Sequence, residues 1–124
     1  MLGTAVTKLC ALEVGLTGVR LEQAIAAGIP AFEATIDTTT VAGYLPHAAP
    51  MTIRMVAEHG TGRVLGAQII GGPGSAKRID TVATAITAGM TVADVMDLDL
   101  AYAPPFSSVW DPVAVVAREA TKEV

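Results

Sequence analysis

The chain has 124 residues, 52% of them hydrophobic and 16% charged, and its 12 acidic and 8 basic side chains give a formal net charge of −4. Folded domains carry about 25% charged residues and disordered chains carry more, so this composition excludes intrinsic disorder and predicts one domain over residues 1–124. Because so few residues are charged, part of the domain's surface is expected to contact another surface. The chain has neither a basic patch for nucleic acid nor the ~20 successive apolar residues that span a membrane, so neither partner is expected.

The chain contains a single cysteine, Cys10, which has no internal disulfide partner. Structural disulfides belong to oxidising compartments, and the N-terminal residues lack the charged and apolar regions of a signal peptide, so we expect a cytoplasmic protein. Cys10 lies in an apolar run without a Cys-x-x-Cys partner, which predicts a buried structural thiol.

The first part of the chain predicts extended structure and one short helix. Apolar and β-branched residues mix over residues 6–18, which indicates an extended segment. Residues 21–27 (LEQAIAA) predict a helix that Gly28 ends. The threonine-rich residues 32–40 have period-two patterning and predict a strand.

A hairpin is predicted next. Residues 51–58 alternate between apolar and polar side chains, as in a strand with one buried face. Residues 64–70 (VLGAQII) are apolar on both faces, which predicts a strand that is either central in the sheet or covered on both sides. The sequence His-Gly-Thr-Gly at residues 59–62 has the length and composition of a connecting turn.

The second half of the chain predicts helices. One stripe has apolar residues at i, i+3, i+4, i+7 and i+11; its members are Ile79, Val82, Ala83, Ile86 and Met90. Thr91 is expected to cap a short following helix, in which Asp94 favours the positive end of the helix dipole. Together these elements predict an α+β fold, in which an antiparallel sheet of about three to five strands carries helices on one face.

The last helix is predicted to begin at Asp111-Pro112, because aspartate is a good N-cap and proline fits the first helical position. It contains four consecutive apolar residues, Val113–Val116. A helix with one buried face does not need such a run, so the run indicates burial on two sides, one of them against a second subunit.

Several kinds of site are not expected. The histidines, His47 and His59, are twelve residues apart in different predicted loops and do not suggest a metal site. Ser107 and Ser108 lack a Gly-x-Ser-x-Gly frame. The glycine-rich residues 71–77 resemble a phosphate loop, but they lack a complete motif and are interpreted as a strand-to-helix turn.

The loop over residues 101–112 (AYAPPFSSVWDP) has an unusual composition. Its two adjacent prolines prevent regular hydrogen bonding, and Tyr102, Phe106 and Trp110 are three of the five aromatic residues of the chain. Such a loop is unfavourable in water, so it either lines a site or interface or packs onto the core of its own domain. The residues alone leave both alternatives open.

Residues 97–118 (DLDLAYAPPFSSVWDPVAVVAR) resemble the C-terminal signature of flavin-dependent pyridine nucleotide–disulfide oxidoreductases, in the branch with coenzyme A-disulfide reductases and NADH oxidases. Residues 3–18, the strand pair 51–58 and 64–72, and residues 77–86 are also similar to this family. The resemblance covers nearly the whole chain and implies the dimerisation domain, with its fold, of a larger flavoenzyme.

The resemblance implies a homodimer, with upstream FAD and NAD(P)H domains in the same polypeptide. This chain alone is then expected to hold no cofactor or metal and to catalyse no reaction. Tyr102 and Tyr44 match two tyrosines that approach the thiol substrate in the partner's site, where a phenol can donate a hydrogen bond or proton to a departing thiolate. The expected dimer interface comprises Pro104, Pro105, Phe106, Trp110, Val113, Val116 and Ala117.

Residues 101–105 contain no histidine, so the His–Glu pair of glutathione- and lipoamide-type reductases is not expected. Two other functions stay open at this point. One is a stand-alone regulatory module that binds a small ligand at its sheet face and the Gly71–Gly74 turn. The other is a complete small enzyme that uses Tyr102 and Asp111.

Overall fold

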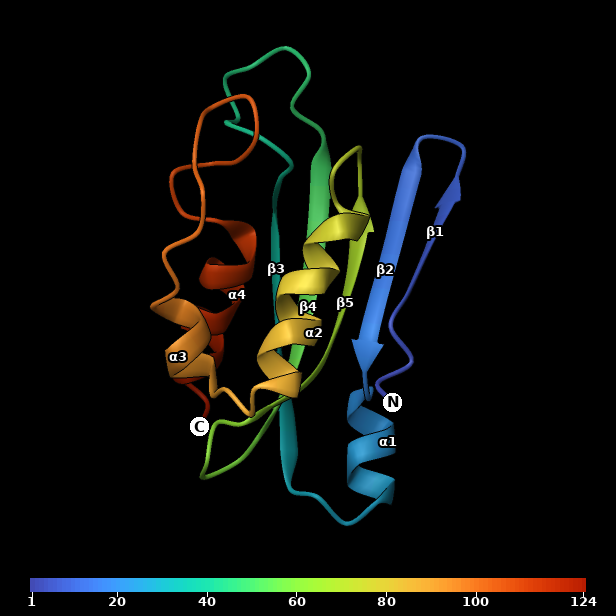
Figure 1. The fold of residues 1–124 in the computed structure, drawn as a ribbon, viewed down its shortest axis with the longest axis vertical. Coiled ribbons are helices and arrows are strands. Elements are labelled where there is room, and N and C mark those ends of the chain that lie inside the picture. The colour runs from blue at the N-terminus through green and yellow to red at the C-terminus, as the bar shows by residue number, and fades with distance from the viewer.

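A five-stranded antiparallel sheet forms the centre of the computed structural model, which describes residues 1–124 (Figure 1). The strands are β1 (Ala5–Leu9), β2 (Leu12–Gly18), β3 (Ala31–Thr39), β4 (Pro50–Glu58) and β5 (Val64–Gly71). They lie in the order β1-β2-β5-β4-β3, so β1 and β3 form the two edges.

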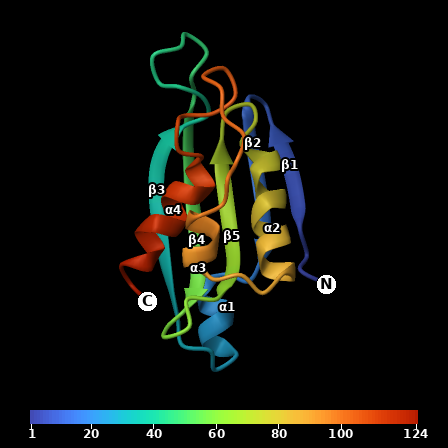
Figure 2. The same cartoon turned by 60° about the vertical axis from the view of Figure 1, so that its left-hand side comes forward.

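Three of the four helices cover one face of this sheet. The helices are α1 (Leu21–Ala26), α2 (Ile79–Thr87), α3 (Val92–Met96) and α4 (Pro112–Thr121), and a 3-10 turn, η1 (Ala76–Arg78), leads into α2. Figure 2 shows α2, α3 and α4 in front of the strands, whereas α1, which connects β2 to β3, lies at one end of the sheet. The predicted α+β fold is therefore confirmed. None of the helices is long and apolar enough to cross a membrane.

The predicted β4–β5 hairpin lies at the centre of the core. Met51, Ile53 and Met55 of β4 are almost completely buried under the helices, and Ile53 pairs with Ile69 of β5. A cluster of 18 buried residues connects these side chains with those of α2, α3 and α4. The chain therefore has a hydrophobic core of its own.

The other face of the sheet is open. β5 is the central strand, as predicted, but it is not covered on both sides, because Ile70 is 45% exposed. All three helices that follow β5 pack on the opposite face, so most of this face is uncovered; the exception is near α1, where Val56 of β4 is fully buried. The open face is aliphatic over β1 and β2, where its exposed residues are Leu9, Leu12 and Leu16. It is polar toward β3, where the Thr52 hydroxyl donates to Asp37 at 2.6 Å.

The extended segment predicted for residues 6–18 consists of two strands, β1 and β2, joined by a tight turn. Cys10 lies in this turn with a positive φ of 55° and is exposed, so the prediction of a buried thiol is wrong. The turn contains no glycine, proline, asparagine or aspartate, the residues that mark most turns in a sequence.

The run Val113–Val116 lies largely inside the subunit. Val113, Val116 and Ala117 are each 0% exposed, because α4 packs against β3 and β4 on one side and against α3 on the other. Burial on two sides is present, but the second side is α3 rather than a second subunit. These three residues have no surface left for a partner, so their predicted interface role is corrected. Within the run, Val115 is the residue that stays partly exposed.

The orientation of α4 predicts unequal effects of two neighbouring substitutions. Val116→Ala removes buried methyl groups and leaves a cavity, so we expect the free energy of unfolding to fall by about 2–3 kcal/mol. Val115→Ala changes a partly exposed side chain and is expected to cost about 0.5 kcal/mol or less. Urea denaturation followed by far-UV circular dichroism measures both, and equal losses would contradict this orientation.

The predicted cap of Thr91 at the start of α3 is confirmed, and Asp94 completes a reciprocal pair of hydrogen bonds with it. The Asp94 N–H donates to the Thr91 hydroxyl oxygen, while the Thr91 N–H donates to the Asp94 carboxylate at 2.8 Å. The hydrogen bond from the Thr91 backbone, and then that from its hydroxyl, hold the pKa of Asp94 below its ordinary value.

Because the pKa of Asp94 is lower in the folded chain, its contribution to stability is present above the unfolded pKa of about 3.9 and is lost as the pH falls through the lowered value. Asp94→Asn keeps an acceptor oxygen but does not titrate. We expect the stability of this variant to fall less steeply than that of the wild type below about pH 4. Urea denaturation across this pH range measures the two slopes, and identical slopes would contradict the assignment.

Candidate functional site

Two loops far apart in the sequence meet at one end of the sheet. Residues 40–49 connect β3 to β4, and residues 97–111 connect α3 to α4; both lie at the top of Figure 1. The Ala42 N–H donates to the Pro104 carbonyl at 3.1 Å and joins the two loops directly. The loops carry the two predicted site tyrosines, Tyr44 and Tyr102, so the fold brings both to the same end.

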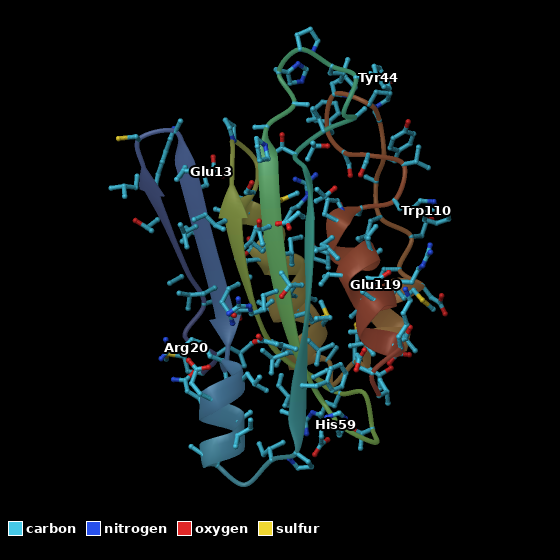
Figure 3. All side chains as sticks on the ribbon, turned by 180° about the vertical axis from the view of Figure 1, so that it is seen from behind. Glu13, Arg20, Tyr44, His59, Trp110 and Glu119 are labelled. Carbon is cyan, nitrogen blue, oxygen red and sulfur yellow. The ribbon has the colours of Figure 1, made fainter.

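Most of the aromatic side chains of the chain are exposed at this end. Of the five aromatic residues, only Phe32 belongs to the core. The other four and a valine are exposed on the two loops, and we call this set of residues the aromatic end: Tyr44 (77% exposed), Tyr102 (47%), Phe106 (75%), Val109 (64%) and Trp110 (69%). The loop over residues 101–112 therefore does not pack its aromatic residues onto the core of its own domain. Figure 3 shows Tyr44 at the tip of its loop and Trp110 beside the start of α4.

Trp110 lines two neighbouring hollows in the surface. One has a volume of about 230 Å³, and the residues that line it with Trp110 include Met96, Ala114, Val115 and Arg118. The other has a volume of about 280 Å³, and the residues that line it with Trp110 include Leu98, Leu100, Tyr102 and Val109. Exposed aromatic side chains beside apolar hollows are typical of the centre of a protein interface. The partly exposed side of α4 continues this surface through Val115.

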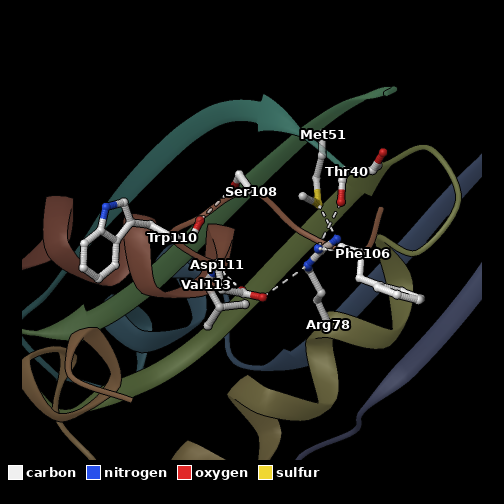
Figure 4. Close-up of polar contacts among 8 residues, drawn as sticks. All are labelled: Thr40, Met51, Arg78, Phe106, Ser108, Trp110, Asp111 and Val113. Atoms are coloured by element: carbon white, nitrogen blue, oxygen red, sulfur yellow. Dashed lines mark hydrogen bonds and ion pairs between the residues drawn. The ribbon is translucent and has the colours of Figure 1, made fainter. Parts of the chain in front are cut away.

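One side chain beneath the loops contacts several separate segments. The Arg78 Nη2 group donates to the Thr40 carbonyl at 3.0 Å and to the Phe106 carbonyl at 2.9 Å. Its Nε atom lies 3.7 Å from an Asp111 carboxylate oxygen, and both side chains are nearly buried, at 12% and 16% exposure. Its Nη1 atom lies 4.0 Å from the Met51 sulfur. Figure 4 shows the guanidinium between these partners.

Asp111 serves two functions at the start of α4. One carboxylate oxygen accepts a hydrogen bond from the Val113 N–H at 2.8 Å, and the other faces Arg78. Pro112 takes the first helical position, as predicted. The residue before the cap is also fixed, because the Ser108 hydroxyl donates to the Trp110 carbonyl at 2.9 Å. Asp111 is thus committed to structure, which leaves the alternative of an enzyme using this carboxylate without support.

The packing of η1 on β2 determines the position of Arg78. Gly15 of β2 allows this close approach, since a Cβ atom there would lie 2.9 Å from the Ala76 carbonyl oxygen and 3.1 Å from the Ile79 Cβ atom. A substitution at Gly15 would therefore push away the segment that carries Arg78.

The glycine-rich turn after β5 binds an acidic side chain of the same chain. One Glu13 carboxylate oxygen accepts from the Gly74 N–H and from the Ala76 N–H, each at 3.1 Å. The turn connects β5 to η1, as the strand-to-helix interpretation predicts. Since Glu13 engages these two amides, the turn offers no support to the alternative of a regulatory module that binds a small ligand at the sheet face and this turn.

The histidines do not come together. His47 precedes β4 and His59 follows it, so they lie at opposite ends of that strand, and the His59 ring lies 4.8 Å from the Phe32 ring. No three metal-ligating side chains cluster anywhere in the chain.

Sequence reasoning missed two features of this site. The role of Arg78 depends on contacts with residues 28 and 38 positions away, which no local pattern reveals. Val115 could have been found, because the buried residues of α4 recur at helical spacing and leave the side that contains Val115 toward the surface.

Exposed aromatic side chains at one end of a domain that has its own core are typical of a surface that associates with another protein. The chain belongs to the family of pyridine nucleotide-disulphide oxidoreductase dimerisation domains, whose family model matches residues 4–114.

Known relatives agree with this assignment. The chain is 42% identical to the NAD(P)H sulfur oxidoreductase (CoA-dependent) of Pyrococcus furiosus over 95% of its length, which is 26% of that protein. It is 33% identical to the NADH oxidase of Methanocaldococcus jannaschii over 100% of its length and 28% of that protein. The structure of a NAD-dependent persulfide reductase from A. fulgidus matches 98% of this chain with a TM-score of 0.93 and 39% identity, over 23% of that chain. The chain therefore spans about a quarter of the length of these relatives.

Two substitutions at Asp111 separate its functions. Asp111→Asn keeps a good N-cap but removes the charge that faces Arg78, whereas Asp111→Ala removes both. We expect the alanine variant to be less stable than the asparagine variant by about 1 kcal/mol, the usual contribution of an N-cap. Guanidinium chloride denaturation measures the difference, and equal stability of the two variants would show that the cap contributes nothing.

Proposed function

We propose that two copies of this chain associate through the aromatic end, and that each copy contributes Tyr102 to a redox site carried by its partner's polypeptide. The observation that carries the proposal is the exposure of four of the five aromatic residues at one end of a folded domain. Aromatic side chains are the commonest anchors of protein interfaces. Pro104, Pro105, Phe106 and Trp110 stay in the proposed interface, and Tyr102, Val109 and Val115 join them.

The proposed parent protein is an FAD-dependent NAD(P)H oxidoreductase in which residues 1–124 act as one dimerisation domain. The supporting fact is that the relatives, an NAD(P)H sulfur oxidoreductase and an NADH oxidase among them, are about four times as long as this chain. The rest of such a polypeptide would hold the FAD and the NAD(P)H, so that this domain alone binds neither and is inactive. The exposed thiol of Cys10 suits a reducing compartment such as the cytoplasm.

The proposed role of Tyr102 is to donate a hydrogen bond to a sulfur substrate of the partner. A phenol positioned near a departing thiolate stabilises its negative charge and can supply a proton. Residues 101–105 contain no histidine, so the phenol is the proton donor of this loop. Tyr44 lies at the same end of the sheet and is proposed as a second contact for the substrate.

The association of the isolated chain tests this proposal. We expect sedimentation equilibrium to show a dimer at micromolar concentration, and Trp110→Ser to raise its dissociation constant at least about tenfold, the effect of losing an interface anchor. The matched control is Ile25→Ser, which changes another exposed apolar residue (58% against 69% for Trp110) on α1, away from the loops. This control is expected to leave the dissociation constant unchanged. A monomeric wild type, or equal weakening by both substitutions, would contradict the proposal.

A further inference from the structure

Arg78 differs from every other basic residue of the chain. The other seven lysines and arginines are exposed, whereas the Arg78 side chain is 12% exposed. Burying a cation is unfavourable unless its donors and its charge are matched. Two carbonyls and the Asp111 carboxylate provide that match, so this side chain is committed to one position.

The carbonyls that Arg78 binds belong to the two tyrosine-bearing loops. Thr40 begins the loop that carries Tyr44, and Phe106 lies in the loop that carries Tyr102. Apart from these contacts through Arg78, one hydrogen bond joins the two loops directly, from the Ala42 N–H to the Pro104 carbonyl. Without Arg78, the relative position of the loops would depend on that single bond and on packing.

We infer that Arg78 is a positioning residue that holds the two loops in one fixed arrangement, so that the aromatic end meets a second copy of the chain as a preformed surface. This inference rests on the proposed function and deepens it. Arg78 itself is too buried to contribute much surface to a partner, so it acts through the loops. A preformed surface loses less conformational freedom when it binds, which strengthens association.

The guanidinium group is suited to this role and an ammonium group is not. Its planar fork donates to both carbonyls from Nη2 while Nε faces Asp111. Arg78→Lys keeps the positive charge but presents a single nitrogen on a flexible stem, which cannot reproduce the fork. This variant therefore separates the positioning role from the charge.

The experiment compares the wild type, Arg78→Lys and the matched control Arg54→Lys, whose side chain is half-exposed in β4 and pairs with Glu33. For Arg78→Lys we expect unchanged far-UV circular dichroism, at least about tenfold faster amide hydrogen exchange confined to residues 40–49 and 97–111, and a dimer dissociation constant raised at least about tenfold. At a concentration at which wild-type chains are dimeric, Arg78→Lys should raise the quenching of the single tryptophan, Trp110, by acrylamide, because dissociated chains leave this exposed residue uncovered. Arg54→Lys should change none of these.

Three outcomes decide the inference. If wild-type chains dimerise and Arg78→Lys leaves both loop exchange and the dissociation constant unchanged, Arg78 does not position the loops, and the proposed function still stands. If exchange rises across β4 and β5 as much as in the loops, the role of Arg78 is general stability and the inference fails. If the wild type is monomeric, the proposed function fails, and with it the part of the inference that concerns a second copy.

A measurement on the unmodified chain covers the case in which Arg78→Lys does not fold. Hydrogen bonds to carbonyl groups slow the rotation of a guanidinium group, which then gives separate signals for its two Nη atoms in a nitrogen-15 NMR spectrum. We expect separate signals for Arg78 and averaged signals for Arg54, which lies in a more exposed ion pair. Averaged signals for Arg78 would overturn the inference.

Discussion

The hydrogen bonds and ion pair of one nearly buried guanidinium group organise the functional end of this domain. The packing of η1 on β2 determines the position of Arg78, and its guanidinium group donates hydrogen bonds to carbonyl groups of both loops. Its charge is matched by Asp111, which also begins α4. A single side chain therefore connects the sheet, both loops and the last helix. The loops have little regular structure of their own, so their arrangement depends on this connection.

The core and the association surface are separate parts of the molecule. The helices bury their apolar stripes against one face of the sheet. The buried residues include the valines of α4 that the sequence suggests for a dimer interface. Two apolar surfaces remain for a partner: the aliphatic part of the open sheet face, and the end of the sheet where aromatic residues and prolines project from loops. Exposing that many aromatic side chains to water is unfavourable for an isolated domain. A partner surface that covers them explains why the sequence carries them there.

Local signals predicted most elements, and long-range contacts account for what was missed. The β4–β5 hairpin, the cap of α3 and the start of α4 follow from alternation, turn residues and capping residues within a few positions of one another. The strand order and the meeting of the two loops depend on residues far apart in the sequence. The turn at Cys10 contains no residue typical of turns, so the sequence does not reveal it. The apolar run in α4 suggested a partner subunit, but α3 covers its second side. The family could be inferred from residues 97–118, whereas the position of Arg78 under the loops required the structure.

The most direct test of the central claim is an isotope-filtered NMR experiment on a mixture of carbon-13-labelled and unlabelled chains, which detects only contacts between two copies. We expect intermolecular contacts from the Trp110 indole ring, the Phe106 ring and the Val115 methyl groups. Contacts confined to Leu12, Leu16 and Ile70 on the open face of the sheet, or no contacts at all, would contradict the claim.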